Sequence, residues 1–149
     1  MTASRSVVDL LPHRPPMRLV EEIVDLVPGQ SACGRRVAHP DDWYFQGHFP
    51  GDPVVPAIVL VELLAQTGGL AASADQVGDP ALRQMLRVAA FSGFKFPGAA
   101  RPHAVLEAFA RVVGRMGGMI KIEGEVTADG VRVAIGGVTL AAVAPVEPS

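Results

Sequence analysis

A chain of 149 residues is long enough for one domain with a proper core and too short for two ordinary ones, so a single domain over residues 1–149 is expected. Its formal net charge of -2 provides no global basic field, which argues against nucleic acid or an anionic membrane as the main partner. Cys33 is the only cysteine, which excludes an intrachain disulfide and any multi-cysteine metal site.

The apolar fraction is high for a chain with so few aromatic residues. Apolar residues make up 49% of the sequence and aromatic residues 5%, so aliphatic side chains must fill the core. We expect part of the surplus to cover an oligomer interface. Cys33 is expected to act as a small apolar side chain in a strand.

The N-terminal residues contain no apolar run of signal-peptide length, which predicts a cytoplasmic protein. The most hydrophobic window, Val54 to Ala65, is interrupted by Pro56 and Glu62 and is shorter than the roughly 20 residues that span a bilayer. No membrane segment is therefore expected. Residues 1–8 and 144–149 are expected to fray.

Two strands are expected first along the chain. Met17 to Val27 alternates loosely between apolar and charged residues and stops at the turn signal Pro28-Gly29-Gln30. Ser31 to Ala38 is the second candidate strand. The segment from His39 to Pro53 is rich in turn-forming residues and predicts a long loop, and long loops are often functional.

A helix is expected next. Pro56 suits its first position because the missing N–H would be unpaired there anyway, and the helix continues from Ala57 to about Ala74. Its apolar residues surround the axis, which indicates burial on nearly all sides. The pair Gly68-Gly69 weakens a helix, so we expect another backbone to approach it closely, and a dimer neighbour could supply that backbone.

The rest of the chain predicts strands joined by tight turns. Gly117-Gly118 and Asp129-Gly130 are hairpin signals, since their residues tolerate positive φ. The candidate strands, expected as one antiparallel meander, are Met85–Phe96, Ala104–Met116, Met119–Thr127 and Val131–Val143. A long buried helix wrapped by a curved antiparallel sheet is an α+β arrangement, and dimerisation would cover its exposed sheet edge.

Two residues suggest proton-transfer chemistry. His48 lies in the loop between Gly47 and Gly51, which allow unusual backbone angles, and Phe45 and Phe49 offer an apolar setting in which an imidazole can act as a base. The alternative is a turn histidine bonded to a local carbonyl.

Glu62 is the second residue, because it interrupts the apolar helix without a cation on its face. Burial would favour its protonated form, which can act as a general acid. The alternative is a glutamate that faces a solvent channel or binds loop N–H groups.

Other patterns are weaker or absent. His13 lies in a segment typical of a structured turn, and His39 with Asp41 and Asp42 would need further ligands from elsewhere to hold a metal. No motif of zinc proteases, serine hydrolases, kinases or nicotinamide enzymes occurs. No metal and no nucleotide cofactor is expected.

Three motifs in order resemble one family. Residues 11–17 read Leu-Pro-His-Arg-Pro-Pro-Met, residues 46–51 read Gln-Gly-His-Phe-Pro-Gly, and residues 61–66 read Val-Glu-Leu-Leu-Ala-Gln. Together they are similar to the (3R)-3-hydroxyacyl-[acyl-carrier-protein] dehydratases of the FabZ type, in the hot-dog superfamily.

The resemblance implies a hot-dog fold, assembled as homodimers that often build hexamers. It implies dehydration of 3-hydroxyacyl chains carried on acyl-carrier protein, in fatty-acid or polyketide-type synthesis, without a metal or redox cofactor. His48 would remove the proton α to the thioester, and Glu62 of the partner subunit would protonate the leaving hydroxyl.

The resemblance also implies a substrate-binding corner. Phe49, Gly51 and Ala57 are the expected substrate-binding residues, with the N–H groups at the helix start stabilising the thioester oxygen. Ala57 replaces the family's usual glycine. Ala100-Arg101-Pro102-His103 stands where a Pro-Gly-Asp turn is common, so carrier docking or substrate loops are open questions.

Two other functions remain open. A hot-dog thioesterase would share the fold and use an acidic helix residue, although the Gly-His-Phe-Pro-Gly loop is not its hallmark. A non-catalytic hot-dog subunit would bind acyl-carrier protein or an active homologue. The acyl chain length, the pathway and the choice of dimer or hexamer are not determined by the sequence.

Overall fold

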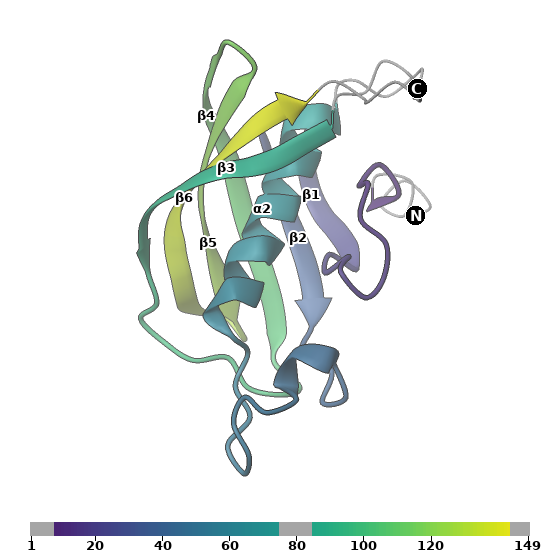
Figure 1. Cartoon of the computed structure of the whole chain (residues 1–149), viewed down its shortest axis with the longest axis vertical. Helices are drawn as coiled ribbons and strands as arrows, with labels where there is room; N and C mark the ends of the chain where they lie inside the picture. Colours follow the sequence, from purple (N-terminus) through teal and green to yellow (C-terminus); the bar gives the residue numbers. More distant parts are fainter. Residues whose placement is uncertain (1–7, 75–84, 144–149) are drawn as a thin grey trace.

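One long helix lies against a curved six-stranded sheet in the computed structural model of the chain, which describes residues 8–74 and 85–143 (Figure 1). The elements in chain order are β1 (Glu22–Val27), β2 (Ser31–Val37), the 3-10 helix η1 (Trp43–Phe45), α2 (Ala57–Ser73), β3 (Met85–Lys95), β4 (Val105–Met116), β5 (Met119–Ala128) and β6 (Val131–Val143). The expected α+β class is confirmed.

The sheet has the order β1-β2-β4-β5-β6-β3, and every neighbouring pair is antiparallel. The meander expected from the sequence holds for β4, β5 and β6. It is wrong for β3, which pairs with β6 at the far edge and does not contact β4 in the ladder. Strand β3 must therefore cross from the end of α2 to the opposite edge of the sheet.

Both predicted hairpin turns are present. Gly117 and Gly118 have φ values of 54° and 81°, and Asp129 and Gly130 have φ values of 50° and 82°. These left-handed backbone conformations suit the twist of the strands that the turns join. Tight turns thus fix the register of β4, β5 and β6.

The first strand is shorter than expected. It begins at Glu22 and not at Met17, because the backbone before it binds a side chain of α2 and not a neighbouring strand. The amide of Gln66 accepts a hydrogen bond from the Leu19 N–H and donates one to the Met17 carbonyl. The segment before β1 is therefore fastened to the helix.

Helix α2 is buried on most of its circumference, as its apolar pattern predicts. Leu63, Leu64 and Leu70 are among its fully buried residues. The exception is a stripe that includes Ile58, which is 75% exposed, and the partly exposed Glu62. Positions four apart share a helix face, so α2 has one uncovered face.

Close approach to the sheet explains the first of the two helix glycines. A Cβ on Gly68 would lie 2.8 Å from a methyl carbon of Ile122 on β5. A Cβ on Gly69 would meet only Leu140, at 4.0 Å. The expectation of a neighbouring backbone, possibly from a dimer partner, is therefore wrong for Gly68, because a side chain of the same chain fills that space.

Two glycines of the sheet also lie against α2. A Cβ on Gly34 would lie 2.5 Å from the Thr67 hydroxyl, and one on Gly124 would lie 2.8 Å from Leu64. These positions let α2 sit closer to the sheet than larger residues would allow. The helix is thereby held in one place along the sheet.

The edge strand β3 is open to solvent. Residues 87–93 are all exposed, and they include Val88 and Phe91, with Phe91 60% exposed. An edge strand presents unpaired backbone N–H and C=O groups that another strand can pair with. Strand β3 is thus one edge of the sheet that is open to a second chain.

The expectation of frayed ends falls on residues 1–7 and 144–149, outside the described part of the chain, and on Val8. The Val8 side chain is 3% exposed and belongs to the hydrophobic core. None of the described helices is long and apolar enough to cross a membrane.

Candidate active site

The loop between β2 and α2 carries His48 on a compact turn. Gly47 and Gly51 both have a φ of 77°, as the sequence predicted from the glycines on either side. The Val54 N–H donates to the His48 carbonyl, and Phe49 and Asp52 exchange backbone hydrogen bonds. Gly51 therefore shapes the turn, and it does not line a cavity with His48.

The His48 ring is oriented by one backbone contact and one aromatic contact. Its Nδ1 lies 3.2 Å from the Val54 carbonyl oxygen, which can only accept, so Nδ1 carries the proton. The Phe49 ring stacks on the imidazole with centroids 4.2 Å apart. Nε2 is left with its lone pair, which is the form that a general base needs.

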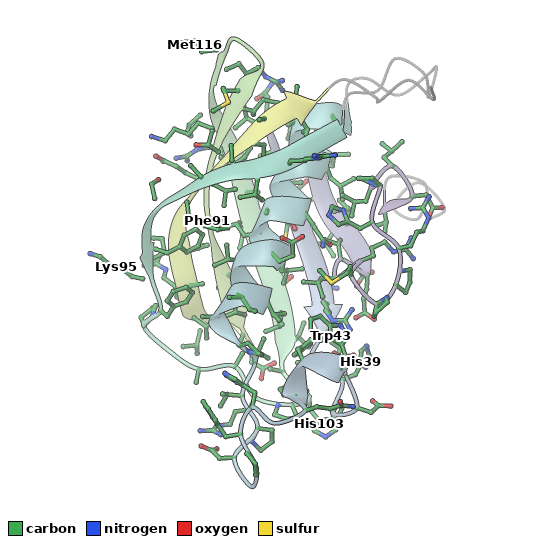
Figure 2. The ribbon with its side chains drawn as sticks, in the orientation of Figure 1. His39, Trp43, Phe91, Lys95, His103 and Met116 are labelled. Atoms are coloured by element: carbon green, nitrogen blue, oxygen red, sulfur yellow. The ribbon has the colours of Figure 1, made fainter. Side chains whose placement is uncertain are left out.

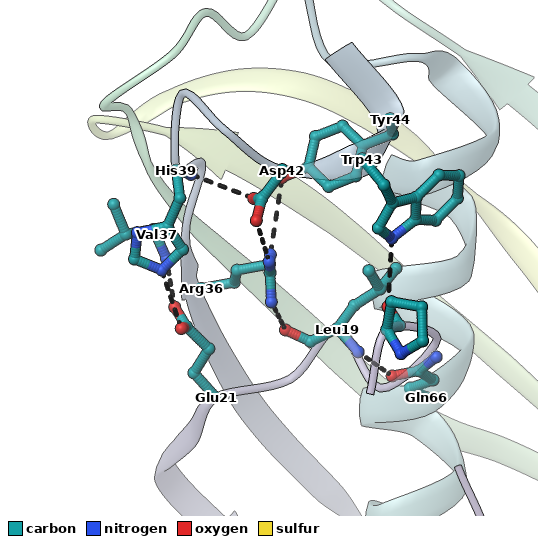
Figure 3. A network of polar contacts seen from close by, with 10 residues as sticks. Leu19, Glu21, Arg36, Val37, His39, Asp42, Trp43, Tyr44 and Gln66 are labelled. Atoms are coloured by element: carbon teal, nitrogen blue, oxygen red, sulfur yellow. Dashed lines mark hydrogen bonds and ion pairs between the residues drawn. The ribbon is translucent and has the colours of Figure 1, made fainter. Parts of the chain in front are cut away.

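A buried polar network supports this loop. The Arg36 guanidinium donates to Asp42 at 2.7 Å and to the Leu19 carbonyl at 3.1 Å, and the Tyr44 hydroxyl donates to Asp42 at 2.6 Å (Figure 3). The side chains of Arg36 and Asp42 are only 11% and 13% exposed. The ion pair therefore fixes the start of η1, which ends three residues before His48, against β2.

The electrostatics of the network follow from burial and pairing. Burial disfavours the charged Asp42 carboxylate, but hydrogen bonds from Tyr44 and Arg36 outweigh it and hold the pKa of Asp42 below its ordinary value. Burial, followed by the hydrogen bond to Asp42, raises the pKa of Tyr44 to about 12. Asp42 thus stays ionised and Tyr44 stays neutral at physiological pH.

Glu62 lies on the partly open face of α2. Its side chain is 28% exposed, so the chain by itself does not bury this carboxylate as fully as the sequence suggested. The Gln66 side-chain amide donates to Glu62 Oε1 at 3.2 Å, and His13 Nε2 lies 3.5 Å from the same oxygen. Two polar side chains therefore meet one carboxylate oxygen.

His48 and Glu62 line different cavities. Glu62 borders a cavity of about 310 Å³ between α2, β3 and the N-terminal segment, together with His13, Gln66 and Gly69. His48 borders a more open hollow of about 490 Å³ at the start of α2, and these two cavities share no lining residue. Within the described chain, no ion pair or hydrogen bond joins His48 to Glu62.

Ala57, expected from the resemblance to bind substrate, shares a hollow with His48. It is the first residue of α2, it is exposed, and it lines the same hollow as His48. The first N–H groups of a helix have no partner within the helix, so they point outward as donors. Trp43 and Ile58, both exposed apolar residues, complete the wall of the hollow.

Three phenylalanines form a cluster on β3 and the residue that follows it. Phe91 and Phe94 meet edge to face with centroids 6.1 Å apart, and Phe94 stacks on Phe96 at 5.9 Å. Figure 2 shows Phe91 and Lys95 on the β3 side of the molecule and Trp43 and His39 near the loop of His48.

The weaker sequence candidates have other partners. His39 Nε2 lies 2.9 Å from Glu21 on the surface, and Asp42 binds Arg36. Among the described residues, no cluster of three or more His, Cys, Asp or Glu side chains is placed to hold a metal ion. Cys33 is buried in β2, as expected for a small apolar side chain.

Sequence reasoning missed several supporting residues. The sequence shows that Gln66 shares a helix face with Glu62, four positions earlier. It does not predict the hydrogen bonds of Gln66 to the segment before β1. The sequence predicts no role for His13 beside Glu62, because nothing in it indicates that the segment of His13 returns to α2. The Arg36–Asp42–Tyr44 network left no signal at all.

The chain is similar to known proteins over most of its length. The family model described as FabA-like domain matches residues 11–136. A protein of Myxococcus xanthus (strain DK1622), 3-hydroxyacyl-[acyl-carrier-protein] dehydratase FabZ, is 35% identical over 130 residues, which are 87% of this chain and 84% of that protein. The protein of the same name from Roseiflexus castenholzii (strain DSM 13941 / HLO8) is 32% identical over 129 residues, or 85% and 90% of the two chains.

A solved structure has the same fold. The dehydratase heterocomplex ApeI:P from Xenorhabdus doucetiae superposes with a TM-score of 0.77 over 91% of this chain and 90% of that chain, at 16% sequence identity. This likeness bears on the fold, and it confirms the hot-dog arrangement that the sequence motifs implied.

Proposed function

Since the chain belongs to the FabA-like domain family, we infer that it removes water from 3-hydroxyacyl thioesters carried on acyl-carrier protein. The three sequence motifs and the names of relatives that match most of the chain support this reaction, and the family match is consistent with it. The product is the 2-enoyl thioester, and the (3R) substrate and trans product follow the sequence resemblance. The observation that carries the mechanism is the His48 ring, whose Nδ1 is bonded to the Val54 carbonyl.

His48 is the base in this proposal. With its proton on Nδ1, the ring offers the Nε2 lone pair to the acidic hydrogen on the carbon α to the thioester. The stacked Phe49 ring lets the imidazole keep its orientation while it takes the proton. Removal of that proton places negative charge on the thioester oxygen.

The start of α2 stabilises that charge. Ala57 lines the hollow that contains His48, and the unpaired N–H groups of a helix start carry partial positive charge. Alanine supplies the same backbone N–H as the family's usual glycine. The side chain of Ala57 narrows the hollow by one methyl group.

Glu62 is the acid. Its carboxyl group gives a proton to the 3-hydroxyl, the C3–O bond breaks, water leaves, and the C2–C3 double bond forms. His48 gains the proton that leaves C2, and Glu62 gives its own proton to the hydroxyl that departs as water. The imidazolium then loses one proton and the carboxylate regains one, so both groups return to their starting states. The elimination oxidises C2 and reduces C3 by the same amount, so the substrate undergoes no net oxidation or reduction and no redox cofactor is required. We propose that no metal takes part.

Two copies of the chain form each site. His48 and Glu62 of one chain line separate cavities, and the face of α2 with Ile58 and Glu62 is only partly covered. Strand β3 offers an open edge for pairing with β3 of a second copy. We propose a homodimer in which Glu62 of the second copy faces His48 of the first.

The reversible hydration of a crotonyl thioester tests the reaction, with the enoyl absorbance followed over time. The wild type should hydrate it, and His48→Ala and Glu62→Gln should each lose about 10²–10⁴-fold in kcat, the usual contribution of general acid or base catalysis. Folded variants with full activity would refute the assigned roles.

The hydrolytic and non-catalytic alternatives have their own signatures in the same assay. Release of free thiol from the thioester, without change at the double bond, would indicate a thioesterase. Binding of acyl-carrier protein without turnover of carrier-bound or small thioesters would indicate a non-catalytic subunit. The shared site is tested with an equimolar mixture of His48→Ala and Glu62→Gln chains. Equilibrium sedimentation shows whether the chains associate, and partial recovery of hydration activity in the mixture would support a site formed by two chains.

A further inference from the structure

His13 approaches the candidate acid from outside α2. Its Nε2 lies 3.5 Å from Glu62 Oε1, and both side chains are 28% exposed. The segment that carries it is fastened to the helix by Gln66 at the Met17 carbonyl and the Leu19 N–H. Trp43 adds a third fastening by donating to the Pro16 carbonyl. His13 is therefore held at the acid by the fold and not by chance contact.

Gln66 shows which way its own amide points. Its oxygen accepts from the Leu19 N–H, which cannot accept, and its nitrogen donates to the Met17 carbonyl, which cannot donate. The amide orientation is thus determined by its partners. The second N–H of the same nitrogen points to Glu62 Oε1 at 3.2 Å, so this oxygen already accepts one hydrogen bond.

The proton of His13 can be placed in a similar way. Its Nδ1 is buried and has no hydrogen-bond partner among the described residues. A buried N–H donor without an acceptor is more costly than a bare ring nitrogen in an apolar setting. A neutral ring would therefore carry its proton on Nε2, the nitrogen that lies 3.5 Å from Glu62 Oε1.

We propose that His13 is a positioning residue for the acid Glu62. His13 donates from Nε2 to Glu62 Oε1, which also accepts from Gln66. The proton that Glu62 transfers is therefore carried by Oε2. This inference rests on the proposed role of Glu62. With two donors on Oε1, a proton on that oxygen would clash with both. The acidic hydrogen then sits on Oε2, toward the cavity.

The proposal depends on the contact between His13 Nε2 and Glu62 Oε1. A contact of 3.5 Å is long for a hydrogen bond, but catalytic hydrogen bonds are often long before substrate binds and tighten in the complex. The other charged group on the cavity wall is Arg87 of β3. Arg14 points away, because it donates to the carbonyls of Leu11 and His13.

An activity-independent test uses nuclear magnetic resonance of protein labelled with ¹⁵N-histidine. His13→Gln identifies the His13 signals among the four histidines. We expect His13 to carry its proton on Nε2, and its ring signals to shift in Glu62→Leu while those of His39 do not. A proton on Nδ1, or His13 signals that ignore the loss of Glu62, would overturn the inference.

The kinetic test compares two replacements of His13. His13→Ala should lower kcat about tenfold, the value of one hydrogen bond to a charged group, with KM unchanged. His13→Gln keeps a donor at the position of Nε2 and should restore most of kcat. His39→Gln is the matched control, since His39 pairs with a surface glutamate away from both cavities.

The two experiments separate the possible failures. Full activity in His13→Ala would refute a positioning role. Equal losses in His13→Ala and His13→Gln, together with lower thermal stability in both, would mean that His13 only packs the N-terminal segment. If the wild type itself has no dehydratase activity, the proposed function fails, and the resonance experiment still decides whether His13 binds Glu62.

Discussion

His48 lies on an irregular loop between β2 and α2, whereas Glu62 lies within the most buried helix of the chain. The loop cannot bond its own backbone in a regular pattern, and a buried ion pair between Arg36 and Asp42 holds it. The helix needs no such pair, because glycines on both surfaces let it pack closely on the sheet. One half of the proposed site therefore depends on electrostatics and the other on shape.

The largest expected effect comes from breaking the ion pair. Arg36→Met leaves the Asp42 carboxylate buried without its cation, which should lower the free energy of unfolding by about 3–5 kcal/mol. Urea denaturation followed by circular dichroism measures it. The control is Arg35→Met on the same strand, because the ion pairs of Arg35 with Glu22 and Glu107 are more exposed than the Arg36–Asp42 pair. Its free energy of unfolding should fall by about 1 kcal/mol or less. Similar losses of unfolding free energy in both variants would contradict the distinction between the buried Arg36 ion pair and the more exposed Arg35 ion pairs.

The second effect tests the packing of the helix. Gly68→Ala forces a methyl group against Ile122 and should lower the free energy of unfolding by about 1–2 kcal/mol, because overpacking exceeds the gain in helix propensity. Gly69→Ala has open space and should raise it by up to about 1 kcal/mol. Thermal unfolding of the two variants in parallel checks the opposite signs, and equal changes would show that the sheet does not limit the helix.

The third effect is a pH dependence that belongs to the loop and not to the helix. Because folding raises the pKa of Tyr44 from 10.0 to about 12, its stabilising contribution is complete below pH 10 and is lost as pH rises toward 12. The loss at pH 11 should be about 1 kcal/mol. Tyr44→Phe should abolish this alkaline dependence, whereas persistence of the slope would assign it to another group.

The smallest effect is chemical and leaves stability unchanged. Burial, followed by the charge of Glu107, raises the pKa of the Cys33 thiol to about 11. A thiol reagent at pH 8 should therefore react very slowly with the folded chain and rapidly in denaturant. The rate in Arg36→Met should be intermediate, since the same strand is loosened. Rapid labelling of the folded wild type would contradict the burial of Cys33.

Most of the fold could be predicted from local patterns, because alternation, turn residues and a long apolar run each determine structure close to their own position. Strand β6 was predicted with its observed ends, and the Gly117-Gly118 turn was recognised. The position of β3 in the sheet could not be predicted, since strand order depends on contacts between distant parts of the chain. The prediction that β1 begins at Met17 is wrong, because the backbone groups of Met17 and Leu19 form hydrogen bonds with the Gln66 side chain.

The site divides in the same way. His48 and Glu62 were visible because a histidine between glycines and a glutamate in an apolar helix are unusual in their local setting. His13 and Arg36 were not visible as supporting residues, because their roles depend on which distant segment they meet. Whether His48 and Glu62 act as base and acid is for the variants above to decide.

The order of the strands has a consequence for synthesis on the ribosome. Strand β3 is made before β4 and β5, yet its sheet neighbour among the described strands is β6, which follows them in the chain. The edge strand with the exposed Val88 and Phe91 therefore has no strand partner until β6 has been made. During that interval the nascent chain exposes an unpaired strand with apolar side chains, a kind of segment that favours aggregation.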